Sequence, residues 1–288
     1  MGHAPEPTRF DRFVAIDWSG ARGTRHKGIA VACCGRGRAA PVLVEAPDGR
    51  AWSRAAVLDW LLARADEAML VGFDFSFSAP FVDRGAHLPG LPATASARDL
   101  WRLVDRACDD VDLGATSFVE RHRGAHFWLG ASDGAKASFL RYRACETPGG
   151  QAKPSTVFDA LGASQVAKAS WAGMRLLHRL GGRVPVWPFD PLPSEGMVVV
   201  EIHTAVAARA AGLRKGLSKL RSPEALSAAL ARLNSDAPAA LSRWDDHATD
   251  AVLAAAWLRA SVGRADLWRP PGLTPAIART EGWTFGVA

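Results

Sequence analysis

Acidic side chains interrupt three of the most apolar stretches of this chain. Asp17 lies within FVAIDW, Asp74 within VGFDFSF and Glu201 within VVVEIH. A carboxylate inside a buried strand is costly unless it is paired, hydrogen-bonded or bound to a cation. Three such acids in separate strands therefore point to a shared site.

The alternation of side chains along a strand indicates where these acids point. Next to Asp17 and Asp74 the positions on the same face are small or polar, whereas the opposite faces carry large apolar residues. If the three strands are neighbours in one sheet, we expect Asp17, Asp74 and Glu201 to converge on one face.

A helix predicted over residues 244–261 adds further acids. Asp246, Asp250, Leu253 and Trp257 are spaced four, three and four residues apart, which places them on one helical stripe. The apolar pair would pack on the sheet, so the two acids would also face it. Asp246 has a second interpretation, because Asp at the start of a helix commonly serves as its cap.

This set of carboxylates has no accompanying Cys or His cluster, which favours a hard cation. We expect Mg²⁺ or Mn²⁺ rather than zinc. Carboxylates that hold two such ions roughly 3.5–4 Å apart can activate water and stabilise a leaving oxygen in phosphodiester cleavage.

Hydrophobic periodicity predicts the elements that position these residues. Strands are expected over 12–19, 27–34, 41–46, 69–77 and 197–204. Helices are expected over 52–66, 96–109, 161–181, 205–233 and 244–261. This order predicts an α/β domain with a mixed sheet flanked by helices. The Gly-rich segment 113–160 reads as an insertion over the sheet edge.

Five short blocks resemble the RNase-H-like superfamily. The blocks are VAIDWSGARG, GFDFSFSAP, EIHTA, DHATDAVLAAA and EGWTF, and they contain Asp17, Asp74, Glu201, His247 and Asp250. Their order is similar to that of the predicted RNase-H-fold nuclease family named domain of unknown function 429. The resemblance spans residues 12–286, and the spacing of His247 and Asp250 is similar to that in bacterial Holliday-junction resolvases.

The resemblance implies a single RNase-H-like domain, in which a three-strand antiparallel meander is joined by parallel strands. It implies a metal-dependent nuclease. Asp17, Asp74, Glu201 and Asp250 would be metal ligands, and Asp246 and His247 would complete the catalytic site.

Basic residues in the middle segment could bind the phosphates of nucleic acid. The candidates are Arg121, Arg123, Arg141, Arg143 and Lys153. A second basic cluster follows the Glu201 strand, and we interpret it as a solvated helix face that could also contact a substrate backbone. Its members are Arg209, Arg214, Lys215, Lys219 and Arg221.

Composition sets wider limits. The 288 residues are 48% hydrophobic, which is typical of a folded domain, and the net charge of +6 is compatible with a polyanionic partner but does not establish one. The four cysteines form no zinc-binding spacing. The chain shows neither an apolar signal core nor an 18-residue apolar run, so we expect a cytoplasmic protein without membrane partners.

Two other functions share the same fold. An actin-like or sugar-kinase-type ATP-binding protein also places Asp at the end of its first strand, but it needs a second Gly-rich phosphate hairpin that this sequence lacks. A non-catalytic nucleic-acid-binding protein would instead pair its buried acids with arginine.

Overall fold

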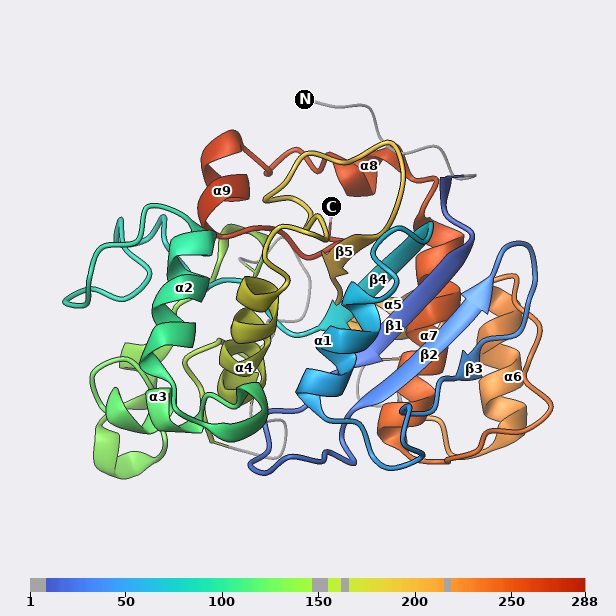
Figure 1. The fold of residues 1–288 in the computed structure, drawn as a ribbon, viewed down its shortest axis with the longest axis horizontal. Helices are drawn as coiled ribbons and strands as arrows, with labels where there is room; N and C mark the ends of the chain where they lie inside the picture. The colour runs from blue at the N-terminus through green and yellow to red at the C-terminus, as the bar shows by residue number, and fades with distance from the viewer. Residues whose placement is uncertain (1–8, 147–154, 162–165, 215–218, 288) are drawn as a thin grey trace.

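The computed structural model describes residues 9–146, 155–161, 166–214 and 219–287. Their centre is a five-stranded mixed sheet flanked by helices, in the order β3-β2-β1-β4-β5 (Figure 1). The strands are β1 Arg12–Asp17, β2 Ala30–Gly35, β3 Val42–Leu43, β4 Met69–Asp74 and β5 Val198–Glu201. The expected α/β class with a mixed sheet is confirmed.

Only β2 runs against the other strands of this sheet. β2 pairs antiparallel with both β1 and β3, whereas β4 and β5 run parallel to β1. β1 and β4 lie at the centre with both faces covered, which explains their continuous apolar sequences. Both end on an acid, and their register places Asp17 directly opposite Asp74.

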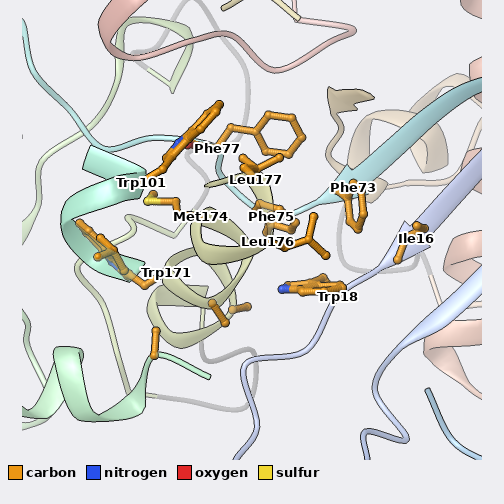
Figure 2. Close-up of a cluster of buried hydrophobic side chains, with 14 of the residues drawn as sticks. Ile16, Trp18, Phe73, Phe75, Phe77, Trp101, Trp171, Met174, Leu176 and Leu177 are labelled. Atoms are coloured by element: carbon orange, nitrogen blue, oxygen red, sulfur yellow. The ribbon is translucent and has the colours of Figure 1, made fainter. Parts of the chain in front are cut away.

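Helices cover both faces of the sheet and enclose two separate cores. The helices are α1 Arg54–Leu62, α2 Ala97–Ala107, α3 Thr116–Arg121, α4 Val166–Arg179, α5 Thr204–Ala210, α6 Pro223–Arg232, α7 Asp246–Ser261, α8 Ala265–Trp268 and α9 Pro275–Thr280. One core lies between the sheet and α1, α2 and α4, and its aromatic side chains come from β4, the residues just after β4, α2 and α4 (Figure 2). The other core contains α5, α6, α7 and the C-terminal segment.

Helix α7 packs directly on small side chains of the sheet. Ala15 of β1, Ala32 of β2 and Gly72 of β4 share the face that α7 covers. An added Cβ at Gly72 would lie 2.7 Å from Ile202 Cγ2 and 2.9 Å from Leu258 Cδ1 of α7. The Ala-rich middle of α7 is buried on most of its circumference, because α5 and α6 contact its other side.

One expected helix differs from the structure. The region predicted as mostly helical over 205–233 contains α5 and α6, separated by Gly212 with φ +78° and by the cap of α6, Ser222. A helix ends readily at a residue with positive φ, and Ser followed by Pro is a strong start signal.

The described part of the 113–160 segment packs on α4 and also reaches β5, an edge strand of the sheet. It contains α3 and three 3₁₀ turns, Ala131–Asp133, Lys136–Phe139 and Ala144–Glu146. Phe118 and Phe127 contact Trp171 of α4, with ring centroids 5.2 Å apart in each pair. The last turn of the segment reaches the end of β5 through Arg143.

Within the described ranges, none of the helices is both long enough and apolar enough to cross a membrane.

The packing of α7 on Gly72 predicts a measurable penalty for one added methyl group. Gly72→Ala should destabilise the protein by about 1–3 kcal/mol, because Ile202 and Leu258 must move. Gly35→Ala is the matched control in β2, where the new Cβ would find its nearest neighbour at 3.8 Å. Denaturant titration of both variants tests this expectation, and equal stabilities would show that α7 does not depend on the gap at Gly72.

Candidate functional site

Asp17 and Asp74 lie side by side at the floor of a cleft outside the carboxyl ends of β1 and β4. Neighbouring strands are about 4.8 Å apart, so these register partners place their carboxylates close together. The cleft has a volume of about 820 Å³ and is also lined by residues from β5, α4, α5 and α7. In open α/β sheets this edge is where ligands commonly bind.

The first turns of α7 bring two more acids and a histidine to this cleft. Asp246, His247 and Asp250 all line it. Asp245 is the residue that caps α7, since its side chain accepts a hydrogen bond from the amide of Ala248. Asp246 is therefore not needed as the cap. The structure places Asp17, Asp74, Asp246, His247 and Asp250 around one cleft.

Asp17 is the most strongly perturbed acid of the cleft. The pKa of its carboxyl is raised to about 7, chiefly by burial and to a lesser extent by the charges of Asp74 and Asp250. A hydrogen bond between Asp17 Oδ1 and His247 Nδ1, 3.2 Å long, opposes the rise. The same bond raises the pKa of His247. The contact with His247 thus only partly offsets the cost of burying a charged Asp17 beside other carboxylates.

Asp250 and Asp246 are partly neutralised by cations. Lys219 Nζ lies 3.0 Å from Asp250 Oδ2 and 3.6 Å from Asp246 Oδ2. Arg221 Nη1 lies 2.9 Å from Asp246 Oδ1. Even so, the pKa of Asp250 is raised, because its burial and the charges of Asp74 and Asp246 outweigh the contact with Lys219.

Within the described ranges, the start of α5 supplies the hydrogen-bond donors to Asp74. The hydroxyl of Thr204 donates to Asp74 Oδ2 over 2.9 Å, and the backbone amide of Thr204 donates to Asp74 Oδ1 over 3.4 Å. These neutral donors fix the orientation of the carboxylate but leave its charge in place.

Glu201 does not converge with the other acids, and this expectation is wrong. β4 and β5 pair with Phe73 opposite Glu201, so its side chain lies on the face of Phe73, opposite to that of Asp74. Its carboxylate forms a buried ion pair with Arg143, in which Arg143 Nη1 lies 2.7 Å from Oε2. The amide of Phe77 and the hydroxyl of Thr284 also donate to it. Glu201 therefore lines the cleft, but its charge is already paired with that of Arg143.

The basic residues predicted to bind phosphate are mostly engaged elsewhere. Arg141 is buried against Asp83, Arg123 pairs with Asp133, and Arg121 donates to the carbonyl of Ala107. None of these three lines the cleft. Arg143 lines it but is shared between Glu201 and a second acid, Glu146. Lys153 and Lys215 lie outside the described residues.

The donor chemistry suits a hard cation, although no ready-made metal cage is present. Across the residues with described positions, no three His, Cys, Asp or Glu side chains form a group that could hold a metal ion as they stand. Mg²⁺ differs from zinc in this respect, because it usually keeps several waters and is bound by one or two carboxylates plus substrate phosphates. The pair Asp17 and Asp74 fits that weaker requirement in charge and in donor type.

No protein-family model, curated protein or solved structure matched this chain.

Sequence reasoning missed the two contacts that complete the cleft. Thr204 follows the β5 strand and carries no catalytic pattern of its own, so only its position at the start of α5 gives it a role. Lys219 was interpreted as part of a solvated helix face, but it lies between α5 and α6 with its ammonium in the cleft. Their spacing along the chain gives no signal for either contact.

Removing the charge of Asp17 should stabilise the protein in a pH-dependent way. Its folded pKa of about 7 exceeds the ordinary value of 3.8, so between these values the native state holds a proton that the unfolded state lacks. This group therefore costs stability as pH rises through that window, by at most about 1.4 kcal/mol per pH unit. The raised pKa of His247 acts with the same sign, because the stability it adds at low pH is also lost as pH rises.

We therefore expect Asp17→Asn to gain stability over the wild type between pH 5 and pH 8. The measurement is chemical denaturation in EDTA, with Asp59→Asn on the exposed side of α1 as control. A difference between wild type and Asp17→Asn that does not change with pH would contradict the incomplete compensation of Asp17.

Glu201 should respond with the opposite sign. Glu201→Gln removes one partner of a buried ion pair, and we expect a loss of about 3 kcal/mol of stability at neutral pH. Denaturant unfolding of this variant beside Asp17→Asn gives the comparison. A neutral Glu201→Gln would mean that Glu146 alone compensates Arg143.

Proposed function

We propose that the chain is an RNase-H-like nuclease, which hydrolyses phosphodiester bonds of nucleic acid with Mg²⁺ or Mn²⁺ as cofactor. The observation that carries this proposal is the pair Asp17 and Asp74, which meet in register at the floor of the cleft and face Asp250. The strand order β3-β2-β1-β4-β5, with an antiparallel meander next to parallel strands, supports the RNase-H-like interpretation.

Asp17 and Asp74 would hold the cation, with Asp250 as a third carboxylate beside them. When bound, the cation would act as a Lewis acid on a phosphate oxygen and would lower the pKa of a bound water. Its charge would also favour the ionised form of Asp17, whose pKa is raised first by burial and then by the charges of Asp74 and Asp250. Glu201 has no place in this set, because Arg143 already neutralises it.

His247 would orient Asp17 and exchange protons at the cleft. Its Nδ1 is engaged with Asp17, so its tautomer and its ring position are coupled to that carboxylate. Its side chain is 48% exposed, which leaves the ring accessible to a substrate. The second ring nitrogen, Nε2, could then give a proton to the leaving oxygen.

Cations at the cleft would bind the polyanionic backbone. Arg209 and Lys219 line the cleft, and Arg221, 73% exposed, extends from its rim. In this arrangement the carboxylates would hold the metal ion, and the neighbouring cations would attract the phosphates of the substrate toward it.

The direct test is a cleavage assay with labelled single-stranded, duplex, hybrid and branched oligonucleotides. We expect cleavage that needs Mg²⁺ or Mn²⁺, is abolished by EDTA, and falls by about 100-fold or more in Asp17→Asn and Asp74→Asn. Asp59→Asn should cleave like the wild type, because its side chain is exposed on α1.

Two results would contradict the proposal. One is cleavage that is unchanged in both cleft variants, which would assign the activity to a contaminant or to another site. The other is the absence of both cleavage and any Mn²⁺-dependent rise in melting temperature when oligonucleotide is present, since a cation that binds the native state must stabilise it.

A further inference from the structure

Lys219 places a cation among the carboxylates of the cleft. Its ammonium contacts Asp250 at 3.0 Å and Asp246 at 3.6 Å. These contacts hold a positive charge beside the proposed metal-binding pair.

The compensation of charge within the cleft is uneven. On the α7 side, Asp250 and Asp246 share the cations of Lys219 and Arg221. On the strand side, Asp74 receives only the neutral donors of Thr204 among its described hydrogen bonds, and Asp17 has the half-exposed His247. Cations therefore pair with the α7 carboxylates, whereas the described partners of the strand pair are the neutral donors of Thr204 and the half-exposed His247.

This distribution bears on the number of cations that the cleft can take. Two divalent ions about 4 Å apart repel each other, and carboxylates on both sides of the pair normally offset that repulsion. Here the carboxylates on the α7 side, Asp250 and Asp246, are already paired with the ammonium of Lys219. A second divalent ion at Asp250 and Asp246 would have to displace Lys219 or lie against it.

We propose that Lys219 takes the place of a second metal ion, so that the cleft binds a single divalent cation at Asp17 and Asp74. This inference rests on the proposed function and specifies its cofactor stoichiometry. The ammonium has three N–H donors, and those not directed at Asp250 and Asp246 can face a phosphate oxygen of the substrate. Lys219 would thereby neutralise the α7 carboxylates and steady the phosphate.

The test is a count of bound Mn²⁺ by electron paramagnetic resonance titration, with no nuclease activity involved. Wild type should bind one Mn²⁺ per chain. Lys219→Met should bind a second, weaker Mn²⁺ because the α7 carboxylates lose their ammonium, and the double variant Lys219→Met/Asp250→Asn should return to one. Lys219→Arg is the matched control that keeps the charge and should bind one. Circular dichroism and melting curves verify that each variant is folded.

Each other outcome has a distinct meaning. Two Mn²⁺ ions on the wild type would overturn the role of Lys219 while leaving the proposed nuclease function standing. One ion on both wild type and Lys219→Met would also overturn it, because removal of the ammonium would then open no site. No Mn²⁺ on any variant, with or without oligonucleotide, would remove the metal-dependent function itself, and this inference with it.

Discussion

The in-register parallel pairing of β1 and β4 is the constraint on which the cleft depends. It sets Asp17 opposite Asp74 at the point where both strands end, so two carboxylates meet where backbone pairing stops and a ligand can approach. A shift of one residue in this register would turn one of them into the opposite core. The large apolar side chains on the other face of both strands, including Ile16 and Phe73, hold the register because they must stay buried.

The second requirement is the close approach of α7. The small side chains of Ala15 and Gly72 let this helix lie near the sheet, and its first turns then carry His247 and Asp250 over the strand ends. Packing in the middle of α7 therefore sets how deeply the acids near its start are buried. The same burial raises the pKa of Asp17, because the ionised carboxylate loses contact with water.

The sequence was sufficient for the parts of this arrangement that follow from periodicity. Apolar runs located the strands, but the stripe of Asp246, Asp250 and Trp257 did not orient α7 on the sheet. Trp257 packs on Phe285 of the C-terminal segment, whereas Leu258 lies over Gly72 of β4. The sequence could not predict the face of the sheet on which Glu201 lies. That face depends on which residue of β4 pairs with Glu201, and the register between the two strands is set by long-range packing. The sequence also could not reveal that Arg143, which lies 58 residues before Glu201, would pair with this acid. Hydrophobic periodicity likewise does not predict contacts made by loop residues such as Lys219.

The contrast between Glu201 and Asp17 separates two uses of a buried acid. Glu201 is matched by Arg143, so its burial ties the 113–160 segment to β5 and leaves no free charge for chemistry. Among the described residues, Asp17 forms its side-chain ion pair with the half-exposed His247, so its burial leaves room for a solvent cation. If these acids served stability alone, a buried arginine partner for Asp17 would be the more stable arrangement. The pair at the strand ends is therefore the feature that argues for function. Lys219 and Arg221, which pair with the α7 carboxylates, limit that function to the strand side of the cleft.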